Sequence, residues 1–454
     1  MKKFIGLLFL IVIIGVPAYI YMSPSFERVP PKITFNHGDY WNLRDKLEID
    51  IKDTSGLKYY KVTLINDGKA KVLKEEQFSP SDIQKDVKVD IKLPEFYPIK
   101  GKLVTIKVET VDKSKWNYFA GNEATKQKEF YIDTISPTTE IINNNYAMKR
   151  GGSGIAIVKV SDDNLKEAYI KVSDSENPQN FIKLKLTPFY KKGYFISLLA
   201  WPYNFQGFNA ELIATDKAGN ISTSHIPMRW KKAWYPKAKI HITKQFIKVV
   251  AIPLLQKVGM NIPNNPVEIF KLVNEKLRKI NEERLYKITN VILDQKINNF
   301  YIRPFRPLKG YAKKASFGEM RTYYYNGEKI SFAIHKGIDI ASYRHAKIYA
   351  SNSGTVIFEG FNGIYGNTLA LYHKLGLVST YSHCSSFNVG VKTHVSRGTI
   401  IAHTGATGAV FGDHLHFGVY VQGIPVEPLE WMDSHWIRDN ISRVIIKAKR
   451  IINR

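Results

Sequence analysis

Two short stretches in the C-terminal third of the chain hold histidines and an aspartate at spacings that suit metal binding. His414 and His416 lie one residue apart in an apolar, strand-like run, and His335 and Asp339 lie four positions apart around Gly337. Imidazole and carboxylate are ligands of catalytic zinc, which takes three protein groups and leaves one position for water. This combination predicts a metal-dependent hydrolytic site.

The spacing of the histidine pair gives it a common orientation. Successive side chains on a strand point to opposite faces, so His414 and His416 face the same side and Leu415 faces the core. One of the pair then binds the metal while the other acts beside it, and the spacing leaves open which does which. His383, at the end of another strand-like run, adds a further imidazole. No role is assigned to His345, His373, His394 and His403.

The sequence around these residues predicts strands separated by glycine turns. Short β-rich runs begin after Tyr301, with few helical periods between them. The runs that carry this pattern cover residues 356–358, 368–372, 378–381 and 417–421. We therefore expect a mostly antiparallel β domain here.

Further towards the N-terminus, polar and apolar residues alternate with period two over two consecutive stretches. This pattern is typical of strands with one solvated face, and its regular spacing predicts β-sandwiches. An Asp followed by Gly-Asn recurs at Asp112 and at Asp216, which indicates two copies of one unit similar to bacterial immunoglobulin-like repeats. The acidic turn at Asp162 is interpreted as a solvated turn rather than a calcium site, since no full set of oxygen ligands surrounds it.

A helical stretch follows the sandwiches. Apolar residues recur three and four positions apart between residues 246 and 292, and Asn265 before Pro266 is a strong helix start signal. Such a stripe most often packs against a neighbouring domain, and the alternative is an element that plugs an active site or binds a partner.

Taken together, the C-terminal blocks resemble those of the lysostaphin-type peptidoglycan metalloendopeptidases. The resemblance is carried by residues 335–341, 350–356, 363–367, 381–383, 405–408 and 414–418. It implies a Zn²⁺ ion bound by His335, Asp339 and His416, with His383 and His414 flanking a water molecule. Two positions depart from the family pattern without removing a ligand: Asp413 stands where Pro is frequent and Cys384 where Leu is frequent.

The resemblance also implies an activity. The family hydrolyses peptide bonds in cell-wall crosslinks, and a membrane-tethered member is expected to cut a crosslink that contains D-alanine. We favour His414 as the general base and His383 as the group that stabilises the oxyanion, and the assignment between the two stays open.

Composition narrows the choice of partners. The 454 residues carry a formal net charge of +26, which favours an anionic partner such as an acidic wall polymer or membrane headgroups. We find no aromatic and basic nucleic-acid module, so nucleic acid is not an expected partner. The single cysteine excludes an internal disulfide.

The N-terminus predicts export. Lys2 and Lys3 precede an apolar run over residues 4–22, whose length suits an uncleaved membrane anchor with a cytoplasmic N-terminus. A cleaved signal peptide, with a small-residue site near Ala18, is the second interpretation. Both place the rest of the chain outside the cytoplasm, in the cell envelope or periplasm.

These observations predict a mainly β, multidomain protein. The expected parts are an anchor or signal peptide at 1–28, immunoglobulin-like β-sandwiches at 29–134 and 135–230, a helical connector at 231–300, an antiparallel β zinc metallopeptidase domain at 301–431 and a basic C-terminal tail at 432–454. We expect the tail to be a solvated helix end.

The retained residues argue against two other functions. A relative without activity could bind peptidoglycan and activate another wall hydrolase, but such relatives typically lose metal ligands, and all are present here. An adhesion module built on the sandwiches would leave the retained histidines unexplained. The sandwiches are instead expected to be spacers or docking sites for envelope proteins.

Overall fold

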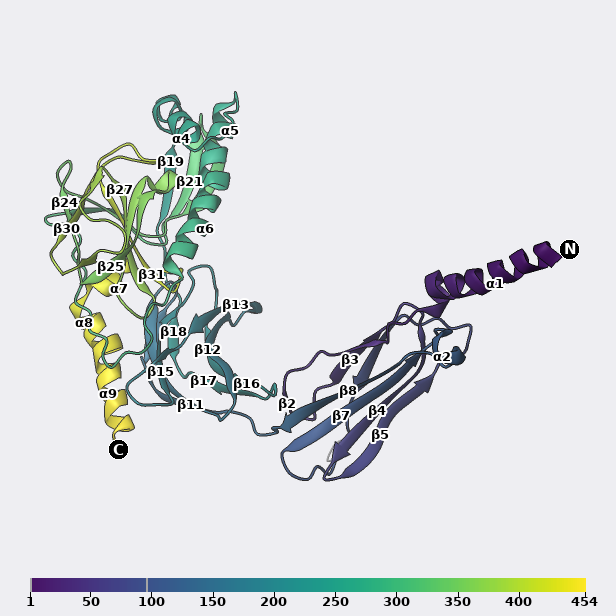
Figure 1. Ribbon diagram of the computed structural model, residues 1–454. Coiled ribbons are helices and arrows are strands. Elements are labelled where there is room, and N and C mark those ends of the chain that lie inside the picture. Colours follow the sequence, from purple (N-terminus) through teal and green to yellow (C-terminus); the bar gives the residue numbers. More distant parts are fainter. Residues whose placement is uncertain (1, 95–96) are drawn as a thin grey trace. The chain divides into compact units, whose positions relative to one another are not determined.

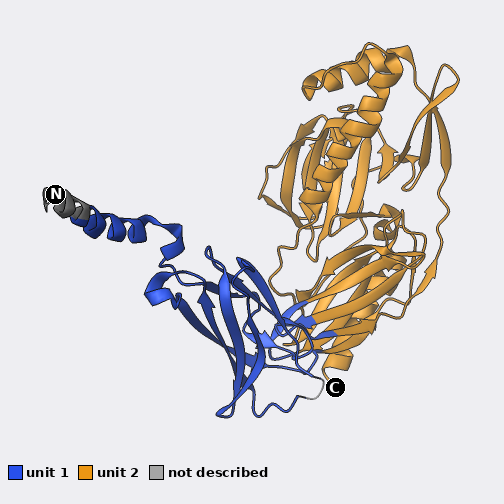
Figure 2. Cartoon of the chain, turned by 90° about the vertical axis from the view of Figure 1, so that its right-hand side faces the viewer, with its two compact units in different colours: residues 1–137, 162–167, 215–221 blue, residues 138–161, 168–214, 222–454 orange. Residues whose placement is uncertain are grey.

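The computed structural model describes residues 2–94 and 97–454. The described chain is mainly β, with helical segments concentrated at residues 244–289 and near the C-terminus (Figure 1). It divides into two compact units (Figure 2). Unit 1 comprises residues 1–137, 162–167 and 215–221, and unit 2 comprises residues 138–161, 168–214 and 222–454.

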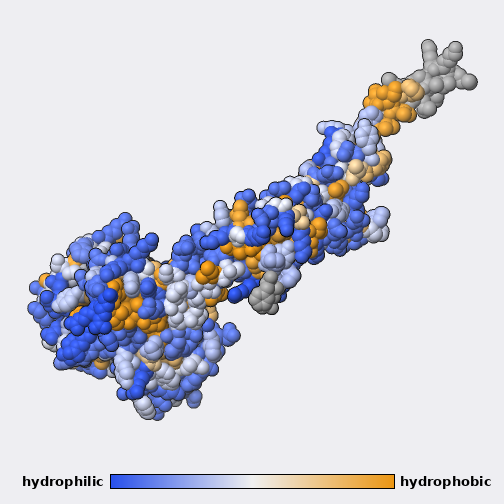
Figure 3. Space-filling view, turned by 90° about the horizontal axis from the view of Figure 1, so that it is seen from below, coloured by the Kyte–Doolittle hydropathy of each residue, from blue (hydrophilic) through white to orange (hydrophobic). Residues whose placement is uncertain are grey.

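The N-terminal segment is helical. Helix α1 (Lys2–Met22) is followed by the short 3₁₀ helix η1 (Pro24–Phe26), and Met1 of the predicted anchor lies outside the described residues. Figure 3 shows hydrophobic residues at the surface of the coloured part of this segment. Ile11 and Tyr19, for example, are 60% and 65% exposed. In the described residues, no helix reaches the length and apolar character needed to cross a bilayer.

Unit 1 contains two sheets around one apolar core. The strand orders are β2-β8-β7-β4-β5 and β1-β3-β6. The bounds are β1 Lys32–Phe35, β2 Tyr40–Trp41, β3 Leu47–Lys52, β4 Leu57–Asn66, β5 Lys69–Gln77, β6 Asp86–Ile91, β7 Leu103–Asp112 and β8 Glu123–Ile132, with α2 at Trp116–Phe119. Residues alternate between buried and less buried along β7, as the sequence predicted. Trp41, Tyr60 and Phe130 fill the core between the sheets.

Two four-stranded sheets follow, with orders β14-β15-β11-β9 and β13-β12-β16-β17. Their bounds are β9 Thr138–Asn144, β11 Ser153–Ser161, β12 Leu165–Asp174, β13 Asn177–Lys185, β14 Thr187–Pro188, β15 Tyr194–Ala200, β16 Asn209–Asp216 and β17 Ile221–His225. Strands β10 (Ala147–Lys149) and β18 (Arg229–Lys231) form a separate parallel pair. The Asp162 carboxylate accepts a hydrogen bond from the Asn164 amide at 2.6 Å, which confirms the predicted turn.

The C-terminal β domain is built on an antiparallel sheet of order β20-β23-β31-β27-β26-β25-β29, with β32 beside β31. Its bounds are β20 Ala312–Ala315, β23 Ile338–Ala341, β25 Gly354–Phe361, β26 Asn367–Tyr372, β27 Leu377–Cys384, β29 His394–Val395, β31 Leu415–Val421 and β32 Ile424–Val426, with η4 at Gly363–Tyr365. A small sheet β24-β30-β28 completes the domain, with bounds β24 Lys347–Tyr349, β28 Ser386–Phe387 and β30 Ile400–His403. The predicted antiparallel architecture is confirmed.

The helical stretch packs beside this domain. It consists of α3 Lys244–Phe246, η2 Ile247–Ala251, α4 Ile252–Lys257, α5 Pro266–Lys271, η3 Leu272–Leu277 and α6 Arg278–Thr289. The Asn265 side chain accepts a hydrogen bond from the Val267 amide, so the predicted helix start is confirmed. The apolar stripe shares a core with the sheet β19-β21-β22 (β19 Lys237–His241, β21 Met320–Tyr325, β22 Glu328–Ile334).

The C-terminal residues form four consecutive helical segments. These are α7 Pro428–Met432, α8 Ser434–Ile437, η5 Arg438–Ser442 and α9 Arg443–Ile452. The basic side chains of Lys447 and Arg450 are exposed, as expected for a solvated helix. The opposite face of α9, with Ile445 and Ala448, is buried in the core of unit 2, which the charge pattern did not indicate.

Candidate metal centre

Antiparallel pairing of β23 with β31 builds the centre of the site. The register places Asp339 directly opposite His416, and His335 lies in the turn before β23. The His335 Nε2 and His416 Nδ1 atoms lie 3.0 and 2.9 Å from Asp339 Oδ1, and 2.9 Å from each other. All three residues are buried, and their ligand atoms lie within 4.8 Å of one another. The structure brings together the three residues named as metal ligands.

The hydrogen-bond partners of these rings fit a metal. His335 Nδ1 lies 2.9 Å from the Ser316 carbonyl, which can only accept, so Nδ1 carries the hydrogen and Nε2 presents its lone pair. Within the described residues, the buried Nε2 atom of His416 has no hydrogen-bond partner. Nε2 can therefore carry the ring hydrogen, which leaves the lone pair of Nδ1 for the metal. Two imidazole lone pairs and one carboxylate oxygen therefore point to one place, as a divalent cation requires.

Gly337 makes room for the second histidine ring. A Cβ atom at this position would lie 2.7 Å from both His416 Nε2 and the Phe417 carbonyl oxygen. Real Cβ atoms do not approach other atoms so closely, so a larger residue would displace either the ring or β31. Glycine is needed here for the close approach of β31.

Asp339 is held as a carboxylate. Burial alone would raise the pKa of Asp339, but the adjacent His335 and His416 lower it well below its usual value. Arg321 on β21 donates from its Nη2 to Asp339 Oδ2 at 3.0 Å, and its Nε donates to Glu319 at 2.8 Å. The oxygen that does not face the histidines is thereby fixed. Sequence reasoning missed Arg321, since no local motif marks it.

Two further histidines flank this centre. The rings of His383 and His414 have centroids 4.8 Å apart, and His414 Nε2 lies 3.8 Å from Asp339 Oδ1. Each ring donates from Nδ1 to a carbonyl at 2.8 Å, Thr407 for His383 and Gly412 for His414. The Nε2 atom of each ring is therefore left free for substrate chemistry.

His383 carries signs of functional strain. It ends β27 with φ of 66°, a left-handed conformation that is uncommon for residues other than glycine. Burial, together with nearby His414 and His416, lowers the pKa of His383 well below its usual value. Its imidazole is therefore neutral in this arrangement.

Comparison with known proteins agrees with this geometry. Residues 333–428 match the model of peptidase family M23. The C-terminal β domain is an M23 peptidase domain. The chain is 34% identical over 99 residues to the DD-carboxypeptidase/endopeptidase Mpg of Neisseria meningitidis. This aligned region covers 22% of this chain and 23% of that protein. It is also 34% identical over 122 residues to the peptidoglycan DD-endopeptidase ShyA of Vibrio cholerae, covering 26% and 28% respectively.

These similarities are confined to part of each protein. The chain spans about a quarter of the length of these curated relatives. Among solved structures, the catalytic domain of lysostaphin from Staphylococcus simulans is 28% identical, covering 27% of this chain and 93% of that one, with a TM-score of 0.23. The M23 assignment rests on the match over residues 333–428 and applies to the C-terminal domain alone.

The M23 domain leaves a small cavity beside the histidines. It has a volume of about 80 Å³ and is lined by the five predicted site residues together with residues that sequence reasoning missed. Arg278 comes from α6, Tyr323 from β21 and Tyr365 from η4. Tyr365 lies against the ring of His416, with centroids 5.4 Å apart. These residues come from elements far apart in sequence, which explains why no motif revealed them.

The two departures from the family pattern have structural roles. Burial raises the pKa of the Cys384 thiol to about 12, and its Sγ donates to the Tyr381 carbonyl at 3.4 Å. The Asp413 carboxylate accepts hydrogen bonds from Thr404 Oγ1 at 2.5 Å and from the His345 amide at 3.1 Å. Asp413 therefore fixes the turn that leads into His414.

Proposed function

We propose that this protein is a zinc endopeptidase that hydrolyses peptide crosslinks of peptidoglycan in the cell envelope. The observation that carries the proposal is the convergence of two imidazole nitrogens and one carboxylate oxygen, with two further imidazoles beside them. M23 membership and relatives named as DD-endopeptidases support a crosslink substrate. Zinc is proposed because His335, Asp339 and His416 match its preferred ligands in open, catalytic sites.

The flanking histidines supply the proton transfers in this proposal. A bound zinc ion would polarise the scissile carbonyl and acidify water. The His414 Nε2 lone pair accepts the proton of the attacking water and returns it to the leaving amine. The neutral His383 ring donates from Nδ1 to the Thr407 carbonyl and so presents a lone pair at Nε2. In this state it can accept a hydrogen bond from the attacking water, and it can donate to an oxyanion only after it has taken up a proton during the reaction.

The test uses purified crosslinked muropeptide dimers. We expect the full-length chain, in mild detergent, to convert dimers to monomers by hydrolysis of one peptide bond, detected by mass spectrometry. A chelator abolishes the activity and added zinc restores it. Failure to cleave with zinc bound at one equivalent would contradict the proposal and favour a regulatory relative that activates another hydrolase.

Variants separate metal binding from proton transfer. We expect His416→Ala to lose both zinc and activity, because it removes a ligand. His414→Ala should keep zinc and lose activity by about 10²-fold or more, as for other general bases. His435→Ala, at an exposed position of α8, serves as the control and should behave like the parent protein. Full activity in His416→Ala would overturn the ligand assignment.

We also propose roles for the remaining segments. The two sandwich regions, 29–134 and 135–230, are proposed to be immunoglobulin-like spacers or docking sites for envelope proteins, joined by the connector 231–300 to the peptidase at 301–431. The apolar segment 4–22 behind Lys2 and Lys3 supports export. N-terminal sequencing of the mature protein from fractionated envelopes distinguishes a retained membrane anchor from a cleaved signal peptide.

A further inference from the structure

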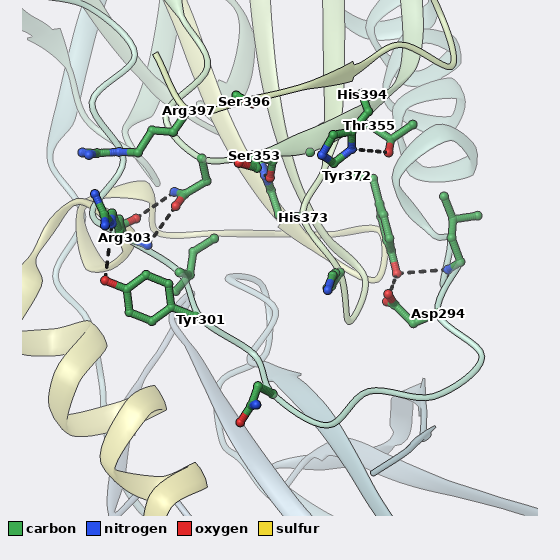
Figure 4. Close-up of a pocket in the computed structure, with 16 residues that line it drawn as sticks. Asp294, Tyr301, Arg303, Ser353, Thr355, Tyr372, His373, His394, Ser396 and Arg397 are labelled. Carbon is green, nitrogen blue, oxygen red and sulfur yellow. Dashed lines mark hydrogen bonds between the residues drawn. The ribbon is translucent and has the colours of Figure 1, made fainter. Parts of the chain in front are cut away.

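Two adjoining cavities, separate from the cavity at the metal centre, lie where residues 293–311 pass along the M23 domain. Their volumes are about 900 and 870 Å³, and both are lined by Arg303 and Arg397. None of their lining residues lines the cavity at the metal centre. Figure 4 shows the larger one, with Arg303 and Arg397 on one side and His394 and Tyr372 on the other. We call the two together the basic groove.

The basic groove is strongly cationic. Its exposed cations are Arg303, Arg306, Lys309, Lys374 and Arg397. Within the described part of the chain, none of these five has a carboxylate within salt-bridge distance. The acidic residue found in the described lining, Asp294, accepts hydrogen bonds from the Leu375 amide and the Tyr372 hydroxyl. The groove therefore attracts anions.

Buried polar groups hold the backbone of two of these residues and the side chain of a third. The Asn352 side chain accepts from the Arg303 amide and donates to the Arg303 carbonyl, each at 2.8 Å. Ser351 accepts from the Arg306 amide through its hydroxyl at 2.9 Å, and its carbonyl accepts from Arg397 Nε at 3.0 Å. Asn352 and Ser351 are both buried. The backbone that carries Arg303 and Arg306 and the side chain of Arg397 are thus held in place, which distinguishes this wall from scattered surface lysines.

Aromatic faces accompany the charges. Tyr301 and Tyr311 line the groove and are 73% and 37% exposed. Arg303 lies 5.8 Å from the centre of the Tyr301 ring, and Lys309 lies 4.8 Å from the centre of the Tyr349 ring. Flat apolar faces beside cations suit an extended ligand that carries both carboxylates and apolar surface. A single small anion would use little of this volume.

We propose that the basic groove is an exosite that holds carboxylate-bearing peptides of peptidoglycan. This inference rests on the proposed wall-hydrolase function and adds a second contact with the wall. Strand β27 begins at Leu377, whose carbonyl accepts a hydrogen bond from the amide of the groove residue His373. It reaches His383 at the metal centre six residues later, a separation of about 20 Å at 3.3 Å per residue. A groove at this distance binds wall peptides other than the bond being cut and keeps the enzyme on an insoluble substrate.

The test measures wall binding without hydrolysis. The full-length His414→Ala chain is co-sedimented with purified peptidoglycan sacculi in mild detergent. Adding Arg303→Gln and Arg397→Gln should weaken binding about tenfold, since several exposed charge contacts are lost together. A matched control removes two charges from exposed positions on β19 and β22, with Lys239→Gln and Lys329→Gln, and should bind like its parent. Amidation of the peptidoglycan carboxylates should reduce parental binding to the level of the double Arg variant.

Three results would overturn the exosite. The first is unchanged binding in the double Arg variant. The second is an equal loss in the Lys control, because net charge would then explain the effect. The third is that the protein still binds amidated sacculi and that short-chain phosphatidylglycerol competes with this binding. That result would assign the groove to a phosphate headgroup.

A separate measurement distinguishes failure of the exosite from failure of the proposed function. With His414 restored, the double Arg variant should cleave soluble muropeptide dimers at the parental rate and intact sacculi more slowly. If the parent itself does not cleave dimers, the proposed function fails. If the variant cleaves sacculi at the parental rate, only the exosite fails.

Discussion

At the scale of single residues, Arg321 extends the metal centre beyond its ligands. Its guanidinium joins Asp339 to Glu319 and so fixes which carboxylate oxygen faces His335 and His416. The geometry requires two donors in one plane, which arginine has and lysine lacks. Groups that orient ligands in this way tune metal affinity.

We predict that Arg321→Gln weakens zinc affinity by about 10 to 100-fold, because Asp339 loses its orienting partner. Arg321→Lys should recover part of this loss through its charge. Competition against a chelating dye measures affinity without relying on activity. Arg344→Gln, at an exposed position of the same domain, should leave affinity unchanged. Parental affinity in Arg321→Gln would show that Asp339 needs no such support.

The metal ligands of this site could be predicted from the sequence, whereas the residues that surround them could not. His335 and Asp339 lie within one turn, and His416 lies in a recognisable block, so local spacing and family resemblance were sufficient to predict their meeting. Arg321 and Tyr365 reach the site only because β21 and η4 pack beside it. Such convergence depends on tertiary structure, for which no pattern in this chain is a guide.

At the scale of elements, α7 joins the M23 domain to β11 through a buried carboxylate. Glu430 accepts hydrogen bonds from the Ser153 amide at 2.9 Å and hydroxyl at 3.3 Å, and Trp431 Nε1 donates to the same hydroxyl at 2.9 Å. Burial raises the pKa of Glu430 from 4.5 to about 7, although Lys149 and the Ser153 amide lower it in part. The folded chain therefore binds this proton more tightly than the unfolded chain.

We predict that the contact between Glu430 of α7 and Ser153 of β11 stabilises the protein less as pH rises. Between pH 4.5 and 7 the folded state binds more protons at Glu430 than the unfolded state, so the free energy of unfolding falls across this window. A difference of 7 − 4.5 = 2.5 pKa units corresponds to about 3 kcal/mol. Urea unfolding at pH 5 and pH 8 should show this loss in the parent and in the control Glu328→Gln, but not in Glu430→Gln. An identical pH dependence in all three would contradict the assignment.

Element type was easier to predict from sequence than element partners. Period-two alternation predicted strands such as β7, and the Asn265 and Pro266 pair predicted the start of α5. Strand β19 falls inside the predicted helical connector, because its short alternation becomes a strand only by pairing with β21. In α9, the lysines and arginines predicted a solvated helix end, whereas apolar residues at helical spacing bury its other face.

At the scale of the molecule, one apolar core within unit 2 joins elements that are far apart in sequence. Ile155 of β11, Phe417 of β31 and Ile445 of α9 belong to the same set of packed buried residues. The core of unit 1 is a separate set that includes Trp41 and Phe130. Elements that share a core tend to unfold together, and elements with separate cores do not.

We therefore predict that damage to α9 spreads through unit 2 and spares unit 1. Ile445 is 5% exposed, and Ile445→Asp would bury a carboxylate without a partner, which should cost about 3 to 5 kcal/mol. Its neighbour Ile446 is 51% exposed, so Ile446→Asp is a matched control with little expected effect. Amide hydrogen exchange followed by mass spectrometry should then show equal loss of protection in β11 and β31, with β7 unchanged. A shared core would be weakened throughout when one of its packed elements is damaged. Loss of protection confined to α9 would therefore show that the helix only docks on a unit that is stable without it.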